Sequence, residues 1–461
     1  QIDSILQLSL WLRADSGFVL DLGGHVKQWN DLSPNQFIFV QNDSSARPLY
    51  GSAYGKPVLV FDGNNDYFDG GDILSLTNQG TTIFLLSKIN NSIGSFLAKS
   101  LAGGVSSRYS LLVENNNFEF LFHENNSHLI SYPITNIYYL WTLEIKNSEN
   151  KIIVRKNGVP IDSTSFNGSF DMTSPYNFLI GAYNNGSGTI PPILFLNGEI
   201  AEIVFINKNL NKITRNAIEK YIMDKYAPPV KLPNDTILTS FCPYVIKPDG
   251  YYTSYTWNDN STNDSLVVNH FGLFSVTVTD IFGRQSSDSI YVQFPENNLE
   301  HIQFLCENDS VILQTGLTYP EFNFLWQNGD TLPNYTVYSP GKYYIYITDQ
   351  HGCTYFSDTI FVQYDPFQYE NVLPDTISIC LGDTLFGYHS EALSYYWSTG
   401  ENTSFILPSQ QAWYSVTITN SRGCKLVDSC FVHIKGQKPQ PSIILSLQCS
   451  RQNILYQGIG L

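Results

Sequence analysis

Several features that define common protein classes are scarce in this sequence of 461 residues. It contains no apolar run near the roughly 20 residues that a membrane-spanning helix needs, so we expect no span. Lysine and arginine number 25 against 41 acidic residues, and the formal net charge is −16. Nucleic acid is therefore not expected as a partner, because its phosphates require clustered cations. Methionine occurs only twice, and charged residues make up only 14%.

Residue patterns of common catalytic sites are also missing. The sequence has no G-x-S-x-G turn of a serine hydrolase and no phosphate-binding P-loop. It also lacks the E-x-D-x-x-E pattern of sandwich-fold glycosidases, so a mechanism with two carboxylates has no candidates. We therefore predict that the chain is not an enzyme and has no catalytic residues.

Aromatic and small polar residues are abundant instead, with 30 Tyr, 29 Phe and 32 Gly. Up to residue 227, short alternating apolar runs are separated by turns rich in Gly, Asn, Asp and Ser, a pattern typical of an all-β sandwich. Asn157-Gly158, between two such runs, predicts a tight hairpin. One helix is expected over residues 212–226, ended by Pro228-Pro229. Its buried face should carry Ile213, Ala217, Ile218, Tyr221 and Ile222.

After residue 233 the sequence repeats itself. Each repeat contains an early Cys, a Trp, an aromatic strand, a Gly turn and a second strand. The interval from Trp to Gly is 26 positions in all three: Trp257 to Gly283, Trp326 to Gly352 and Trp397 to Gly423. Units of about 70 residues with alternating strands and a central Trp predict small immunoglobulin-like sandwiches.

The predicted fold class is all-β: an N-terminal β-sandwich, here called the head, followed by tandem immunoglobulin-like modules. The expected ranges are 1–229 for the head, 234–295 for repeat 1, 300–365 for repeat 2, 372–436 for repeat 3 and 441–461 for the start of a fourth repeat. Because Cys449 follows Cys380 at about the repeat distance, the fourth repeat should be cut short and the chain should be part of a longer protein. A start at Gln1 indicates that a signal peptide has been removed.

The cysteines of repeats 2 and 3 indicate disulfides. Cys306 with Cys353, and Cys380 with Cys424, stand at matching places in their repeats, so we predict these two intramodule pairs. A zinc site would need C-x-x-C pairs, which are missing. Two disulfides imply an oxidising, extracellular location.

Repeat 1 lacks the second of these cysteines. Arg284 occupies its place, so Cys242 should be unpaired. In repeat 3, Cys430 replaces a strand residue and is expected to be a buried free thiol.

An acidic turn over residues 62–72 is the candidate metal site. Carboxylates on a turn rich in Gly and Asn suit Ca²⁺, and Asp62 and Asp66 are the candidate ligands. Alternatively, Asp and Asn only cap their own backbone there. Tyr50, Tyr54 and Tyr183 are candidates for stacking on a sugar.

Several stretches of the head form a recognisable set: Leu10-Trp11-Leu12-Arg13-Ala14-Asp15, Gln28-Trp29-Asn30-Asp31-Leu32-Ser33, residues 57–67, Asn157-Gly158-Val159 and Gly198-Glu199-Ile200-Ala201-Glu202-Ile203. Through these stretches, residues 8–226 resemble a laminin-G-like (concanavalin-A-like) jelly-roll domain of Bacteroidota-type cell-surface proteins. Repeat 3 contains the stretch Tyr395-Tyr396-Trp397-Ser398-Thr399-Gly400. Through it, the repeats resemble the immunoglobulin-like or PKD-like modules of the same proteins.

This resemblance implies a non-enzymatic secreted protein, exported by type 9 secretion, with an adhesin-like head on a stalk. The head would bind a glycan or a surface protein. Two alternatives are the non-catalytic N-terminal part of a larger secreted enzyme, and a filament component or substrate of a type 9 secretion assembly, with secretion or assembly components as partners. A recurrent Asp-Ser/Thr-apolar triplet matches the O-glycosylation sequence of that phylum, although it can also simply start a strand. The candidate acceptors, each expected just before a strand, are Ser289, Thr359, Thr236 and Thr376.

Overall fold

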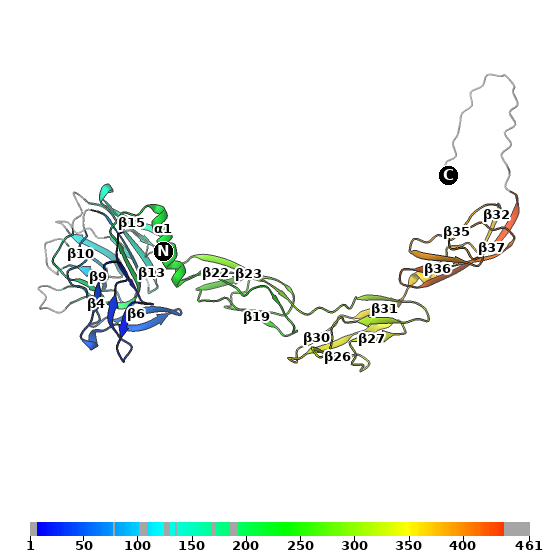
Figure 1. Ribbon diagram of the computed structural model, residues 1–461, viewed down its shortest axis with the longest axis horizontal. Helices are drawn as coiled ribbons and strands as arrows, with labels where there is room; N and C mark the ends of the chain where they lie inside the picture. The colour runs from blue at the N-terminus through cyan, green and yellow to red at the C-terminus, as the bar shows by residue number, and fades with distance from the viewer. Residues whose placement is uncertain are drawn as a thin grey trace, which may run out of the picture. The chain divides into compact units, whose positions relative to one another are not determined.

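A computed structural model describes residues 7–76, 79–100, 108–123, 130–133, 136–166, 172–184 and 192–437 (Figure 1). The regular secondary structure of the described residues is almost all β-strand and forms several β-sandwich sheets, which confirms the all-β fold class. The chain divides into two compact units, Gln1–Ile237 with Pro243–Gln293, and Leu238–Cys242 with Phe294–Leu461. The fourth repeat expected at 441–461 lies outside the described residues. No described helix is long and apolar enough to cross a membrane.

The head is built from two β-sheets. The first orders its strands β15-β14-β13-β8-β17-β6-β5, with β1 also paired to β17. Its strands are Leu8–Arg13 (β1), Leu49–Ala53 (β5), Lys56–Asp62 (β6), Thr81–Ile89 (β8), Tyr139–Lys146 (β13), Lys151–Lys156 (β14), Val159–Ser165 (β15) and Asn197–Ile206 (β17).

The second sheet orders its strands β12-β11-β10-β9-β16-β7-β4-β3-β2. These are Phe18–Leu20 (β2), Val26–Asn30 (β3), Ile38–Val40 (β4), Phe68–Asp69 (β7), Gly94–Lys99 (β9), Arg108–Glu114 (β10), Asn117–His123 (β11), Ile130–Pro133 (β12) and Phe178–Ile180 (β16). Alternate residues of both sheets face each other and form the main core. Phe118 of β11 stacks on Trp141 of β13 with ring centroids 3.8 Å apart, which joins the two layers.

The predicted hairpin lies between β14 and β15. Asn157 and Gly158 both have positive φ, 51° and 80°, as a two-residue hairpin turn requires. The Asn157 side chain also fixes the neighbouring strand, because its Oδ1 accepts a hydrogen bond from the Leu140 amide at 2.9 Å.

Helix α1 spans Lys212–Tyr226, the predicted range. Asn211 caps its first turn by accepting a hydrogen bond from the Thr214 amide at 2.8 Å. The predicted buried face is only partly right. Ile218 and Ile222 are buried as expected, but Ile213, Ala217 and Tyr221 are exposed, Ile213 by 83%. Arg215 and Glu219 are buried instead. The helix is rotated because its contact with the sheet is made by ion pairs as well as by apolar side chains.

In every repeat the first strand pairs in parallel with the last strand. Repeat 1 contains the sheet β18-β23-β22-β20 and the pair β19-β21. Its strands are Thr236–Ile237 (β18), Tyr244–Ile246 (β19), Ser254–Trp257 (β20), Leu266–Val268 (β21), Gly272–Thr279 (β22) and Gln285–Gln293 (β23).

Repeat 2 forms the sheets β24-β31-β28 and β26-β29-β30 and the pair β25-β27. Its strands are Ile302–Leu305 (β24), Val311–Gln314 (β25), Phe322–Trp326 (β26), Asn334–Val337 (β27), Gly341–Tyr343 (β28), Ile345–Asp349 (β29), Thr354–Phe356 (β30) and Ile360–Tyr364 (β31). Repeat 3 forms β32-β37-β36-β34 and β33-β35. Its strands are Thr376–Leu381 (β32), Leu385–Phe386 (β33), Ala392–Trp397 (β34), Phe405–Ile406 (β35), Ala412–Asn420 (β36) and Lys425–Gln437 (β37).

The tryptophans of the three repeats play the same part. Trp257, Trp326 and Trp397 are buried in the cores of their repeats. Each indole N–H donates to the carbonyl oxygen six residues further on, at 2.8–2.9 Å. The polar end of a large apolar side chain is thereby satisfied, so the shared Trp marks the same structural position in each copy.

The disulfides differ from the predicted pairs. The structure pairs Cys242 with Cys353 and Cys306 with Cys424, and Cys380 is a free thiol. Cys242 is therefore not unpaired. Cys430 is free and buried, as expected.

The registry of repeat 3 explains why the intramodule pair is impossible. Strand β32 runs parallel to β37 with Ile379 opposite Ile434, so Cys380 lies level with the far end of β37. Cys424 immediately precedes the start of the same strand. Ten residues of strand span about 33 Å, whereas a disulfide needs Cα atoms within about 7 Å.

Candidate functional site

The first unit contains a pocket of about 230 Å³ where the head meets repeat 1. We call it the junction pocket. It is lined by aromatic, charged and small residues from both parts of the unit: Tyr54, Lys56, Tyr226, Ala227, Pro228, Asp249, Gly250, Tyr251, Tyr252 and Ile281. Aromatic walls with a few polar groups are typical of small-molecule sites. The volume is below the roughly 300–1,000 Å³ of sites for drug-sized ligands, so it suits a ring-sized ligand.

Tyr54 is the most unusual residue of this pocket. It lies in the turn between β5 and β6 with φ of 52°, a left-handed conformation that is rare for a bulky side chain. Its ring stacks on that of Tyr251 at 4.3 Å and meets the ring of Tyr138 edge-on at 6.0 Å. Such unfavourable backbone conformations persist where surrounding contacts hold them, and they often occur at ligand sites.

Tyr138, whose ring contacts the Tyr54 ring, is held in place by a hydrogen bond of its hydroxyl group. Tyr138 donates its hydroxyl hydrogen to Glu199, which also pairs with Lys88 at 3.1 Å. Burial, together with the hydrogen bond to Glu199, raises the pKa of Tyr138 far above its usual value. Tyr138 is therefore a fixed hydrogen-bonded support for Tyr54.

Two opposite charges face the pocket without partners. Among the described residues, neither the Lys56 ammonium nor the Asp249 carboxylate has a hydrogen-bond or ion-pair partner. On the repeat 1 side, the buried Tyr252 donates its hydroxyl hydrogen to the carbonyl of Asp249 at 2.9 Å, and burial raises the pKa of Tyr252. The pocket therefore offers aromatic faces, a cation and an anion to a polar ligand.

The candidate sugar-stacking tyrosines lie in three different places. Tyr54 lines the junction pocket, but Tyr50 packs against Phe18 at 4.7 Å, and Tyr183 is buried in a small cluster with Ala98. Sequence patterns did not indicate the part of the pocket contributed by repeat 1, because nothing in the sequence shows which loop of a repeat meets the head.

The acidic turn of the head uses its carboxylates on its own backbone. Asp62 Oδ1 accepts hydrogen bonds from the amides of Asn64, Asn65 and Asp66, at 2.8–3.4 Å. Asp66, which is buried, accepts one from the Asp62 amide at 2.9 Å. This arrangement is the capping alternative to a metal site. A calcium ion on Asp62 and Asp66 remains a prediction.

The turn nevertheless allows a pH-dependent test. Burial raises the pKa of Asp66 to about 6, against the effect of the Asp62 amide. A carboxyl whose pKa is raised by folding stabilises the protein when protonated, and this contribution is lost as the pH rises from about 4 through 6. Asp66→Asn should therefore be more stable than wild type by about 1–2 kcal/mol at pH 7.5, with little difference at pH 4. Urea unfolding at both pH values measures this.

Asp62→Asn is the matched control. Burial alone would raise the pKa of the Asp62 carboxyl, but its hydrogen bonds outweigh burial and the pKa is lowered. The ionised carboxylate therefore stabilises the protein above about pH 4. This variant should lose stability at pH 7.5. If Ca²⁺ binds here, millimolar Ca²⁺ should raise the melting temperature of wild type but not of Asp66→Asn. Identical melting curves in Ca²⁺ and EDTA would count against the calcium site.

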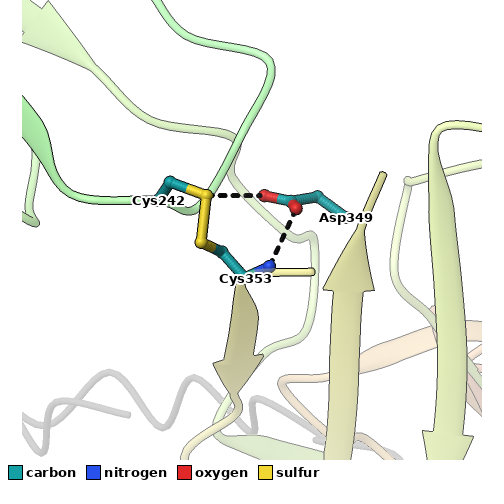
Figure 2. A group of neighbouring side chains, drawn as sticks. All are labelled: Cys242, Asp349 and Cys353. Carbon is teal, nitrogen blue, oxygen red and sulfur yellow. Dashed lines mark hydrogen bonds between the residues drawn. A yellow bond between two sulfur atoms is a disulfide. The ribbon is translucent and has the colours of Figure 1, made fainter. Parts of the chain in front are cut away.

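A second cluster with metal-binding side chains lies in the other unit (Figure 2). Cys242 and Cys353 form a disulfide beside Asp349, whose Oδ2 accepts hydrogen bonds from Ser240 Oγ at 2.6 Å and from the Phe241 amide at 2.7 Å. Burial opposes the charge, but these hydrogen bonds prevail and the pKa of Asp349 is lowered. Since both sulfurs are oxidised, the cluster offers no thiolate to a metal. Its role is structural.

The glycosylation candidates are placed differently from one another. Thr236 and Thr376 start strands and Thr359 directly precedes one, but Ser289 lies within β23, opposite Ser275. The expectation that Ser289 precedes a strand is wrong, although its side chain is exposed. O-glycosylation at these four residues remains a prediction.

The aspartates of two Asp-Ser/Thr-apolar triplets accept hydrogen bonds from backbone amides. Asp288 Oδ2 accepts a hydrogen bond from the Leu232 amide at 2.8 Å. Asp428 Oδ2 does the same for the amides of Val372 and Leu373, also at 2.8 Å. In both places the aspartate binds the linker that enters its repeat, so the triplet recurs for a structural reason as well.

No protein-family model and no curated protein sequence matches the chain significantly. The search of solved structures matches, among others, the CBM40 of the Ruminococcus gnavus IT-sialidase bound to α2,3-sialyllactose, at 13% identity and a TM-score of 0.27, covering 31% of this chain and 83% of that one. Domain 4 of an extracellular arabinanase from Geobacillus stearothermophilus, in complex with arabinotriose, has 16% identity, a TM-score of 0.34 and coverage of 46% and 98%. The receptor-binding domain of botulinum neurotoxin D has 11% identity, a TM-score of 0.37 and coverage of 75% and 86%. Such low identities and TM-scores say nothing about the function of this chain.

Proposed function

We propose that this chain is a non-catalytic, extracellular binding protein that holds a glycan in the junction pocket. The observation that carries the proposal is the lining of that pocket. Tyr54 and Tyr251 offer aromatic surface for a sugar ring, while Lys56 and Asp249 offer unpaired charges to its hydroxyl or acidic groups. The repeats would serve as the stalk of the binding head.

The cysteine chemistry supports the extracellular part of the proposal. Disulfides persist in oxidising compartments, and the described cysteines form two of them. The resemblance to surface proteins adds the finer proposal of an adhesin-like role and export by type 9 secretion. Isolation of the chain from culture medium or from the outer surface of its host would test that location.

Replacing Tyr251 by alanine should weaken glycan binding at least about tenfold, or about 1.4 kcal/mol. The change removes one aromatic wall and frees the Tyr54 ring that stacks against it. The measurement is a glycan array with neutral and acidic glycans, followed by calorimetry on the best one. Lys56→Met should reduce binding selectively if the bound glycan is acidic, and Asp249→Asn if it is neutral.

Tyr338→Ala is the matched control, because Tyr338 is 74% exposed and does not line the pocket. It should bind like wild type. Wild type that retains no glycan on the array, or equal affinities of wild type and Tyr251→Ala, would refute a glycan site in this pocket.

A further inference from the structure

The three repeats share one turn, which we call the junction turn. It comprises Asp280–Arg284 in repeat 1, Asp349–Cys353 in repeat 2 and Asn420–Cys424 in repeat 3. In each, the first side chain accepts hydrogen bonds through Oδ1 from the amides two and four residues later, at 2.8–3.1 Å. The turn is therefore preformed in every copy, and the direction of its last residue is fixed.

The last residue of each junction turn bonds to the part of the chain that precedes its repeat. Arg284 donates to Asp224 Oδ1 and to the Ala227 carbonyl of the head, both at 2.7 Å. Cys353 and Cys424 form disulfides with Cys242 and Cys306, the early cysteines of the preceding repeats. Repeat 1 is preceded by no early cysteine, and its junction turn ends in Arg284. In repeats 2 and 3 the junction turn ends in a cysteine, which forms a disulfide with the early cysteine of the preceding repeat. We call that early cysteine the receiving cysteine.

Cys380 has the same local structure as the receiving cysteine of repeat 2. Cys306 accepts a hydrogen bond through its carbonyl from the Asp309 amide at 3.2 Å, and Cys380 accepts one from the Asp383 amide at 3.0 Å. The intervening turn has positive φ at the matching residue, 62° at Asn308 and 88° at Gly382. Cys306 directly follows the first strand of its repeat, and Cys380 is the next-to-last residue of the first strand of its own. In both repeats that strand pairs in parallel with the last strand.

We propose that Cys380 is a third receiving position, which forms a disulfide with the cysteine of a junction turn from a further module of this repeat type. The partner turn would read Asp/Asn-x-x-Gly-Cys, because the acidic or amide cap and the glycine are what the described turns share. The proposal concerns the stalk and does not depend on glycan binding.

A second copy of this chain does not fit as the partner. Its junction turns end in Arg284, or in Cys353 and Cys424, which are already bonded. Of its two free thiols among the described residues, Cys430 is buried in the core of repeat 3, and Cys380 is itself a receiving position that belongs to no junction turn. The partner must therefore be a module whose junction turn carries a free thiol.

Bond formation requires an oxidant, which we take to be a small-molecule disulfide such as oxidised glutathione. The Cys380 thiolate attacks the donor disulfide and releases one donor thiol. The partner thiolate then attacks the sulfur of the mixed disulfide at Cys380 and releases the second donor thiol. Two protein thiols and one donor disulfide thus become one protein disulfide and two donor thiols.

The first test uses the chain as it stands. Under native, non-reducing conditions, N-ethylmaleimide should modify Cys380 completely and Cys430 only after denaturation. Cys380 is half-buried, so its sulfur should be reachable. An unreactive Cys380, or its discovery in a disulfide with Cys449, would overturn the proposal.

The second test supplies a partner. A copy of residues 367–437 fused after Gln437 adds one module with its own core and junction turn. Peptide mapping after refolding with oxidised glutathione should find Cys380 linked to the added copy of Cys424, with both original disulfides unchanged. In the control fusion, where the added Cys424 is replaced by serine, Cys380 should stay free to alkylation. A folded fusion in which Cys380 remains a free thiol, or pairs with another cysteine, would refute the receiving role.

Discussion

Replacing Cys306 and Cys424 together by alanine should lower the free energy of unfolding of the second unit by about 4–5 kcal/mol. The disulfide between them closes a loop of 118 residues, and loops of about that length contribute near 5 kcal/mol by restricting the unfolded chain. The double replacement avoids leaving a reactive thiol. Guanidinium unfolding of wild type and variant without reductant measures the difference.

Cys380→Ala is the control for this prediction, because it removes a half-buried sulfur that closes no loop among the described residues. It should change the free energy of unfolding by less than about 1 kcal/mol. Adding reductant should destabilise wild type and leave the double variant nearly unchanged, apart from the effect on Cys242–Cys353. A double variant as stable as wild type would mean that the non-covalent contacts between Arg422 and Asp365 suffice to hold repeats 2 and 3 together.

The disulfide pairs illustrate what a repeat alignment can and cannot predict. The alignment correctly places Cys306 and Cys380 at equivalent positions, and likewise Cys353 and Cys424. It does not show that the two positions of repeat 3 lie at opposite ends of its last strand, because that depends on the parallel pairing of β32 with β37. Nothing in local sequence specifies such a long-range pairing.

The absence of a second cysteine in repeat 1 could have indicated the correct disulfide pairing. The last position of the junction turn is Arg284 in repeat 1, which follows the head, and a cysteine in repeats 2 and 3. This difference is expected if that cysteine forms a disulfide with the preceding repeat rather than within its own repeat. If disulfides between neighbouring repeats had been considered, the residues of the junction turns could have been identified from the sequence.

The buried face of α1 was mispredicted in part, and for a different reason. Its range follows from local signals, the capping Asn211 and the prolines after Tyr226, and these were sufficient. The orientation of the helix depends on Glu144 and Arg155 of the sheet, which lie far away in sequence and are charged. A rule that buries only apolar residues cannot find a helix face that contains an arginine.

The junction pocket was only partly visible in the sequence. Tyr54 was a candidate because it stands in a turn, but Tyr251 and Asp249 belong to repeat 1 and join it only after the head and repeat 1 have packed together. The fold class, by contrast, follows from alternating strands and turn residues along the chain, which are local features.

Replacing Glu144 by alanine should lower the free energy of unfolding of the first unit by about 3–5 kcal/mol, the usual result of breaking a buried ion pair from one side. Glu144 accepts a hydrogen bond from Arg155 Nε at 2.7 Å and pairs with Arg215 Nη1 at 3.2 Å. Its side chain is 2% exposed and that of Arg215 is 6% exposed. Without Glu144, the remaining carboxylate near Arg215 is Glu219 at 3.8 Å, and burial raises the pKa of Glu219, which weakens it as a counter-ion.

Two further variants separate the buried charge from the packing. Glu149→Ala removes an acid whose pair with Lys146 is exposed, and it should cost less than about 0.5 kcal/mol. Glu144→Leu combined with Arg215→Leu removes one charge of each sign and should recover most of the loss, since paired buried charges can often be replaced by apolar side chains. A loss of less than about 1 kcal/mol in Glu144→Ala, or a double variant less stable than the single one, would contradict the interpretation. It would then follow that apolar contacts of Ile218, Ile222 and Met223 with the sheet, rather than the ion pairs, determine which face of α1 is buried.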